Sequence, residues 1–173
     1  MIARDYWKAV TVDRSDFLDQ FLALLRESGA RYCIVGGQAV NAYVDPVVSL
    51  DLDLVVALDD RKLLEPILER QFRIEQFPHS TNLSMPGSDL RVQIQTDPRY
   101  ESFIDRAATR DVLGIQLSVA TPEDVLQGKV WAASDESRRG SKRQKDLADI
   151  ARLIEAYPHL SSLVPEELKR RLL

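Results

Sequence analysis

Two stretches of the sequence decide the fold of this chain: Tyr32-Cys33-Ile34-Val35-Gly36-Gly37 and, after 13 intervening residues, Asp51-Leu52-Asp53-Leu54-Val55-Val56. The first predicts a short buried strand that runs directly into two glycines and then into a turn or two of helix up to residue 43. The second alternates polar and apolar residues before it becomes fully apolar, which is typical of a strand over residues 49–56 that is polar on one face only at its start. Because successive side chains of a strand point to opposite faces, the two aspartates project from the same side.

The pattern around these stretches predicts further helices and strands. Helices are expected from a Ser15 cap to Gly29 and over residues 59–71, 101–108, 121–137 and 142–156, with a short terminal helix from residue 165. Strands are expected over residues 72–77, 90–95 and within 112–119, whereas residues 78–88, with two prolines and a glycine, are predicted to be mainly loop with at most a short strand around Leu83. The order of elements indicates an α+β or mixed α/β fold, in which residues 1–120 form the core and residues 121–173 a C-terminal helical part packed on the same domain.

Length and composition limit the class of protein. A chain of 173 residues buries roughly 68–70% of its unfolded surface and is expected to form one domain without a disulfide or zinc site. The lone Cys33 can form no internal disulfide, which favours a reducing compartment. The apolar runs are too short to span a bilayer and the N-terminus has no apolar signal core, so a cytoplasmic protein without a membrane partner is expected.

The twin aspartates and the glycine pair suggest a site for a metal and a phosphate. Two carboxylates held side by side repel each other unless a cation lies between them, and hard oxygen ligands suit Mg²⁺ or Mn²⁺. Gly36 and Gly37 would let backbone N–H groups approach an anion at the start of a helix. An isolated Asp-x-Asp is more often a pair of solvated acids at a strand edge, so the neighbouring glycines are what favours the functional interpretation of Asp51 and Asp53.

At these residues the chain resembles the nucleotidyltransferase superfamily that includes DNA polymerase beta, whose signature is a hydrophobic residue with Gly-Gly or Gly-Ser, a spacer, and Asp-hydrophobic-Asp. Within that superfamily it is similar to the AbiEii-type group, which includes toxins of type IV toxin–antitoxin systems. The second similarity lies near the C-terminus, where Lys129-x-x-Ala132 precedes a basic stretch and Lys145-Asp146-Leu147-x-Asp149-Ile150. The matches run over residues 33–153.

The resemblance implies a nucleotidyltransferase-like mixed sheet flanked by helices and a Mg²⁺-dependent or Mn²⁺-dependent transfer of a nucleotide from a nucleoside triphosphate to an RNA end or another hydroxyl. Asp51 and Asp53 would hold the metal, and Gly36, Gly37 and Ser49 would contact the triphosphate. The partners it implies are the triphosphate, an RNA or protein acceptor, and a cognate toxin or antitoxin.

The resemblance also assigns roles in the C-terminal part. Lys129 would stabilise charge on the phosphates, Asp146 would orient a neighbouring base or lysine, and Lys145 would contact the nucleotide. The alternative for Lys129 is a solvated helix lysine. The alternative for Asp146 and Asp149 is ion pairing with basic residues within a turn of the same helix.

The chain departs from the family pattern at two places. Val47 and Ser49 stand where many AbiEii-like chains have Arg and Thr, so the hydroxyl is kept and the guanidinium is lost. The third carboxylate of polymerase-type members is expected on the strand over residues 90–95, where Gln93 replaces it as a weak metal ligand that cannot act as a base. Asp89 and Asp97 lie four residues away, roughly 13 Å along a strand. An enzyme with another base and a nucleotide-binding or antitoxin-like module without turnover therefore both remain open.

Other candidate features carry less chemistry. A dense basic run could hold acceptor phosphates or the triphosphate, or simply form a solvated face: Arg138, Arg139, Lys142, Arg143 and Lys145. Trp131 falls on the apolar stripe of its helix and is predicted to be a core residue. His79 and His159 have no second ligand at zinc spacing.

Overall fold

The structure is a computed structural model of the whole chain and describes residues 3–172. Its strands are β1 (Tyr32–Val35), β2 (Asp51–Val56), β3 (Arg73–Phe77), β4 (Ser80–Ser84), β5 (Arg91–Gln95), β6 (Ala108–Val112) and β7 (Ile115–Val119). Its α-helices are α1 (Ala3–Val10), α2 (Phe17–Ser28), α3 (Gly36–Asn41), α4 (Leu58–Gln71), α5 (Phe103–Arg106), α6 (Pro122–Ser134), α7 (Gly140–Ala156) and α8 (Glu166–Lys169). Single 3₁₀ segments occupy Pro98–Tyr100 and Pro158–Leu163.

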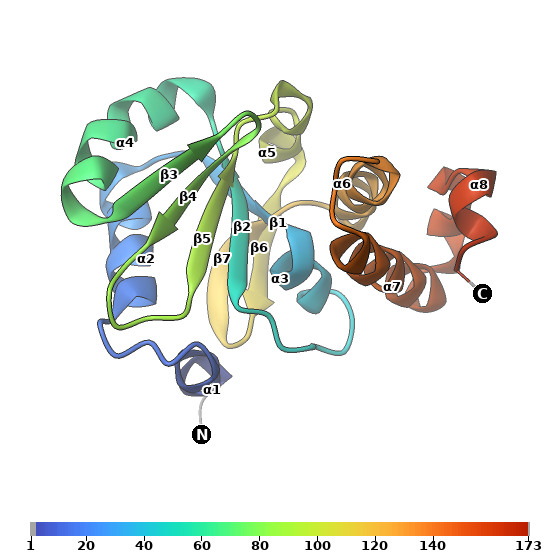
Figure 1. Cartoon of the computed structure of the whole chain (residues 1–173), viewed down its shortest axis with the longest axis horizontal. Coiled ribbons are helices and arrows are strands. Elements are labelled where there is room, and N and C mark those ends of the chain that lie inside the picture. Colours follow the sequence, from blue (N-terminus) through green and yellow to red (C-terminus); the bar gives the residue numbers. More distant parts are fainter. Residues whose placement is uncertain (1–2, 173) are drawn as a thin grey trace.

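All seven strands form one mixed sheet in the order β3-β4-β5-β2-β1-β7-β6. β1 pairs antiparallel with β2 and parallel with β7, and β2 pairs parallel with β5. Helices α2 and α4 lie on one side of the sheet, and α3, α6 and α7 lie on the other, with α8 beyond them (Figure 1). The predicted class, a mixed sheet flanked by helices with a helical C-terminal part, is confirmed.

The register of the three central strands determines what surrounds the aspartates. Val35 of β1 pairs with Asp53 of β2, so the chain leaves β1 at Gly36 directly beside Asp53. On the other side, Asp53 pairs with Gln93 of β5. Since residues paired across a sheet point to the same face, Gln93 and Asp53 share the face that carries the polar side chains.

One continuous hydrophobic core includes side chains from the sheet and from both groups of helices. Four apolar residues of β2 and β5 alternate with the polar ones and are buried on the opposite face: Leu52, Leu54, Val92 and Ile94. The aromatic rings of Phe17 and Phe72, also in the core, lie 5.1 Å apart. Helix α3 packs against both α6 and α7. The largest fully buried side chains are Phe17, Phe21, Leu18, Ile34, Leu52, Leu54, Leu83, Leu90, Ile94, Leu126, Ile150 and Leu153.

Several predicted local structures differ from those observed, each for a physical reason. The short strand allowed around Leu83 in the predicted loop over residues 78–88 is present but longer: residues 80–84 form β4, because pairing with both β3 and β5 satisfies the backbone of a segment with few strand-forming side chains. The helix expected over residues 101–108 covers only Phe103–Arg106, and β6 begins at Ala108. Ser15 does not cap α2. The first N–H groups of the helix, those of Phe17 and Leu18, donate instead to the Asp13 carboxylate at 2.9 and 3.0 Å.

Two observations bear on the environment of the protein. Cys33 is buried in β1 and is free. Among residues 3–172, no helix combines the length and the apolar character needed to cross a membrane.

Candidate nucleotidyltransferase site

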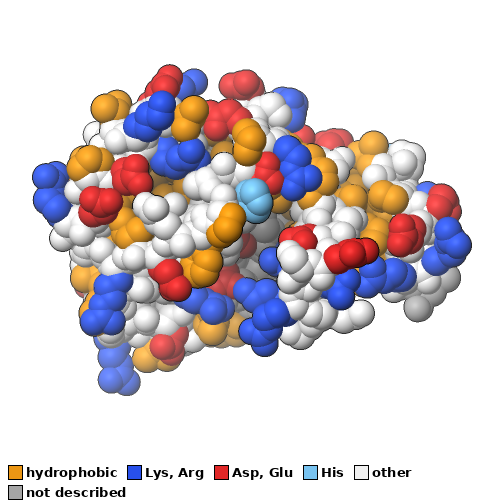
Figure 2. All heavy atoms as spheres, turned by 45° about the horizontal axis from the view of Figure 1, so that its top comes forward, with side chains coloured by type: hydrophobic (Ala, Val, Ile, Leu, Met, Phe, Trp, Pro, Cys, Tyr) orange, Lys and Arg blue, Asp and Glu red, His pale blue; other side chains and the backbone are white. Residues whose placement is uncertain are grey.

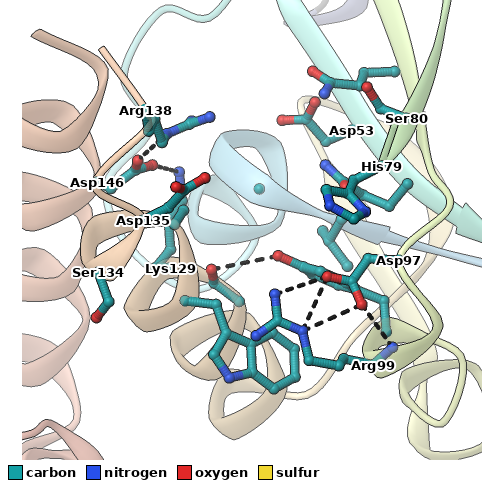
Figure 3. A pocket seen from close by; sticks show the side chains of 18 of the residues that line it. Asp53, His79, Ser80, Asp97, Arg99, Lys129, Ser134, Asp135, Arg138 and Asp146 are labelled. Atoms are coloured by element: carbon teal, nitrogen blue, oxygen red, sulfur yellow. Dashed lines mark hydrogen bonds and ion pairs between the residues drawn. The ribbon is translucent and has the colours of Figure 1, made fainter. Parts of the chain in front are cut away.

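A cavity of about 570 Å³ lies between the polar face of the central strands and helix α6 with the start of α7. Its wall is formed by the end of β1, by β2 and β5, by the β3–β4 turn and by the segment that joins α6 to α7. Figure 2 shows a hollow near the middle of this face, bordered by charged side chains of both signs. In Figure 3, Asp53 and His79 lie across this space from Lys129, Arg138 and Asp146.

Gly36 fixes the position of Asp53 in this cavity. Its backbone has φ +68°, a left-handed conformation that favours glycine, and a Cβ built on it would lie 2.9 Å from both Cβ and Cγ of Asp53. Helix α3 therefore begins at Gly36 with its N-terminus against the carboxylate. Gly37, the next residue, lies close to Ser49, whose Oγ is 3.6 Å from the corresponding built Cβ.

The two aspartates of β2 have different surroundings. Burial, together with the negative charge of Asp51, raises the pKa of Asp53 to about 6, although the cations Lys129, Arg138 and Lys142 oppose the rise. Asp51 does not line the cavity, and its Oδ1 lies 2.8 Å from Nε of Arg91, its neighbour on β5. The Asp53 carboxylate is thus the one that faces the cavity without a cation in direct contact.

A buried ion network stands opposite Asp53. The Lys129 ammonium of α6 lies 3.0 Å from Asp146 and 2.8 Å from Asp149, both on α7. Burial alone would lower the pKa of Lys129, but the charges of Asp149 and Asp146 more than offset it, so the pKa is raised and the ammonium stays charged. Arg138 donates to the second oxygen of Asp146 at 2.7 Å and lines the cavity.

The same network reaches the loop before β2. Arg152 of α7 pairs with Asp149 at 2.8 Å and donates to the backbone carbonyl of Asp45. Asn41 at the end of α3 exchanges hydrogen bonds with the backbone of Val47. These contacts hold the loop that contains Val47, between α3 and β2.

The donor set fits a divalent cation that shares its ligands with a substrate. Asp53 and Asp51 supply carboxylate oxygens on one face of β2, and Gln93 presents an amide oxygen from the neighbouring strand. Within residues 3–172, no group of three or more His, Cys, Asp or Glu residues could by itself hold a metal ion. Such a set suits Mg²⁺ or Mn²⁺, which keep waters and take further ligands from bound phosphates, and it would need Asp51 to exchange Arg91 for the metal.

The structure brings together part of the predicted site. The predicted residues that line the cavity are Gly36, Asp53, Gln93, Lys129 and Asp146. Those outside its lining are Asp51, Gly37, Ser49 and Lys145. Ser49 is buried beside Gly37, just before β2, and Lys145 is exposed on α7. The alternative of a solvated Lys129 is wrong, and so is the pairing of Asp146 with basic residues one turn away on its own helix.

Several residues of the cavity lining are not predicted by the sequence to belong to the site, and they include Asp97, which it places too far along the strand from Gln93 to supply the third carboxylate. His79 lies at the β3–β4 turn, and its backbone carbonyl accepts from Thr96 N–H at 2.9 Å. Asp97 holds Arg99 at 2.7 Å, and the Arg99 guanidinium lies 4.5 Å from the ring centroid of Trp131. Trp131, predicted to be a core residue, is only partly buried and packs on the core while it lines the cavity. No motif spacing links these residues, because separate turns bring them to the same place.

The mixed sheet, the glycine at the end of β1 and the aspartate that it contacts define a protein of the nucleotidyltransferase class. The chain belongs to the AbiEii family, described as nucleotidyl transferase AbiEii toxin of type IV toxin–antitoxin systems, whose model matches residues 16–173.

Solved structures share the fold. ANT(2")-Ia in complex with adenylyl-2"-tobramycin is similar with a TM-score of 0.58 and 18% identity over 90% of this chain and 92% of that one. The lincosamide antibiotic adenylyltransferase LnuA, bound to lincomycin, is similar with a TM-score of 0.54 and 12% identity over 83% of this chain and 99% of that one. A search of curated proteins found no match.

Proposed function

We propose that this protein transfers a nucleotidyl group from a nucleoside triphosphate, bound with Mg²⁺ or Mn²⁺, to a hydroxyl of an RNA end or of another acceptor. The observation that carries the proposal is that Gly36, Asp53 and the charged Lys129 border one cavity. A metal-binding carboxylate, an anion-accepting backbone and a fixed cation are the groups that a triphosphate needs. The type IV toxin–antitoxin context in the description of the family supports a role as a toxin with a cognate antitoxin.

Each residue of the cavity has a distinct task in this reaction. Asp53, with Asp51, would hold the cation, which neutralises charge on the phosphates and orients them. Lys129 is oriented by Asp146 and Asp149, and its ammonium offsets negative charge as pyrophosphate leaves. Arg138, in the segment just before α7, lines the same cavity and contributes a second cation.

The proton of the attacking hydroxyl needs an acceptor other than Gln93, because an amide takes no proton at neutral pH. His79 lines the same cavity, and a neutral imidazole has one nitrogen free to accept. As the acceptor oxygen bonds to the α-phosphorus, its proton would pass to His79, and the bond to pyrophosphate breaks. A His79→Gln variant should therefore bind the triphosphate normally and transfer it at least tenfold more slowly.

A second candidate function is that of a nucleotide-binding module without turnover. The position opposite Asp53 holds Gln93 in place of a carboxylate, which favours it. This candidate predicts binding of triphosphates without release of pyrophosphate.

Two measurements test both candidate functions. The first is calorimetric titration with ATP, GTP, CTP and UTP in Mg²⁺, and the second is transfer of an α-³²P label to tRNA and protein acceptors. We expect metal-dependent binding and labelled product with the native chain, and neither with Asp53→Asn. Arg138→Ala should weaken triphosphate binding, whereas Lys145→Ala is the matched control, since Lys145 is exposed and outside the cavity lining. Binding of no triphosphate at all would refute the proposal, and binding without product on any acceptor would leave the second candidate.

A further inference from the structure

The cavity has a second wall that the metal and phosphate groups do not use. Tyr100, Phe103 and Trp131 form an aromatic cluster, in which the Phe103 and Trp131 rings are nearly parallel, with centroids 5.7 Å apart and an angle of 8°. Tyr100 meets Trp131 edge to face at 5.2 Å. Tyr100 and Trp131 line the cavity, whereas Phe103 is buried behind them. The Trp131 ring is therefore supported from the core side and turned toward the cavity.

The Trp131 ring already carries a planar group. The guanidinium of Arg99 lies 4.5 Å from the ring centroid, and three hydrogen bonds from the Arg99 side chain to Asp97 hold it there. The Arg99 side chain is more than half exposed, at 55%. This arrangement shows that one face of the ring accepts a flat, π-bonded partner, and that this partner is itself largely exposed to solvent.

We propose that the base of the nucleoside triphosphate stacks on Trp131, in the position that the Arg99 guanidinium takes in the free protein. This inference rests on the proposed function and adds the orientation of the substrate. The triphosphate lies at the end of the cavity with Gly36, Asp53 and Lys129, and the base at the end with Trp131. Lys129 and Trp131 both belong to α6 and both line the cavity, so the same helix positions both ends of one nucleotide.

At the Trp131 ring itself, a base makes a stronger contact than a guanidinium does. A cation over an exposed aromatic ring contributes about 2- to 5-fold in an equilibrium constant. Stacking of a base on an aromatic side chain contributes about 5- to 150-fold. Every base has a π face, so this contact favours nucleotides over bare polyphosphate without selecting among the four bases.

The test compares nucleotides with tripolyphosphate, which has the phosphates and no base. We expect Trp131→Leu to weaken binding of each Mg²⁺-nucleoside triphosphate about 5- to 150-fold, to leave Mg²⁺-tripolyphosphate affinity unchanged, and to be largely restored by Trp131→Phe. The chain has two tryptophans. Nucleotide binding should therefore quench fluorescence in the native chain and not in Trp131→Leu, where the buried Trp7 is the remaining indole. Thermal melting of both variants shows whether they are folded.

The outcomes separate the inference from the proposed function. If neither nucleotide nor tripolyphosphate binds the native chain, both fail. If nucleotides bind Trp131→Leu as tightly as the native chain, the inference is overturned while the proposed function stands. Quenching by tripolyphosphate equal to that by nucleotides would overturn it as well, because the signal would then come from the phosphates alone.

Discussion

Replacing Asp53 by Asn should stabilise the metal-free protein at neutral pH. The native carboxylate is enclosed between Gly36 and the neighbouring strands and faces Asp51, which raises its pKa to about 6. A carboxyl group with a raised pKa in the folded state binds its proton more tightly there than in the unfolded chain. The contribution of protonated Asp53 to the free energy of unfolding is therefore fully present below the unfolded pKa of 3.8 and is lost as the pH rises through about 6.

The size of the effect follows from the two pKa values. A rise from 3.8 to about 6 corresponds to at most about 3 kcal/mol of unfolding free energy at pH 7.5. The Asp53 carboxylate retains some contact with water in the cavity, so about 1–3 kcal/mol is expected. For a chain of this length that is roughly 2–12 °C in melting temperature. The asparagine side chain is uncharged and has the same shape, so the substitution removes the charge without adding a cavity or a clash.

The difference in the free energy of unfolding is measured by thermal and urea unfolding of the native chain and of Asp53→Asn. Both are unfolded in buffer with a chelator from pH 4 to pH 8. The two proteins should differ little in stability near pH 4, close to the unfolded pKa of 3.8, and Asp53→Asn should be clearly the more stable above pH 6. Addition of Mn²⁺ should stabilise the native chain and leave Asp53→Asn unchanged, because binding to the folded state alone adds stability. Asp59→Asn, at an exposed position on α4, is the control and should show no dependence of this kind.

The opposite result would refute the reasoning. If Asp53→Asn unfolds at a lower temperature than the native chain in metal-free buffer at pH 7.5, the Asp53 carboxylate is a structural group that forms favourable contacts in the folded state. The site would then be no binding site for a cation.

Three further outcomes are expected. Arg91→Gln frees Asp51 from an exposed ion pair worth up to about 1 kcal/mol, so Mn²⁺ affinity measured by calorimetry should rise by up to about fivefold, and weaker binding would show that Arg91 helps to hold the ligand. Gly36→Ala places a Cβ against Asp53 at a positive φ, which should lower the unfolding free energy in urea by at least about 2 kcal/mol; an unchanged midpoint would contradict the close contact. Lys129→Met leaves two buried carboxylates without their shared partner and should lower stability by about 3 kcal/mol at pH 7.5, so a neutral effect would mean that the network is not formed.

The strand–glycine–strand arrangement of the site could be predicted from the sequence because its signals are local. Alternation in β2 puts Asp51 and Asp53 on one face, and the glycines directly after β1 mark a close approach of backbone. The position of Gln93 opposite Asp53 also follows from strand alternation once β2 and β5 pair. Each of these statements depends on the geometry of one strand or one turn.

The cavity wall opposite the aspartates could not be predicted in this way. From the sequence alone, Lys129 could be a solvated helix lysine, and the aspartates of α7 could pair within their own helix. Only the packing of α6 on α7 joins them in one buried network. His79 falls in a segment predicted to be loop, because nothing local shows that β4 pairs on both sides and turns this residue toward Asp53. Burial and shared ion pairs arise from segments that are far apart in the chain.

What the sequence by itself determined is the glycine and aspartate part of the site: Gly36 and the aspartate strand, whose conformations follow from residue type and from the two-residue period of a strand. Only the tertiary structure decided that Asp53 and not Asp51 faces the cavity, that Arg91 pairs with Asp51, and that Trp131 and Arg99 form the far wall. The physical reason is that charge pairing, desolvation and ring stacking depend on distances between side chains from different elements, and these distances are fixed only when the sheet and the helices pack together.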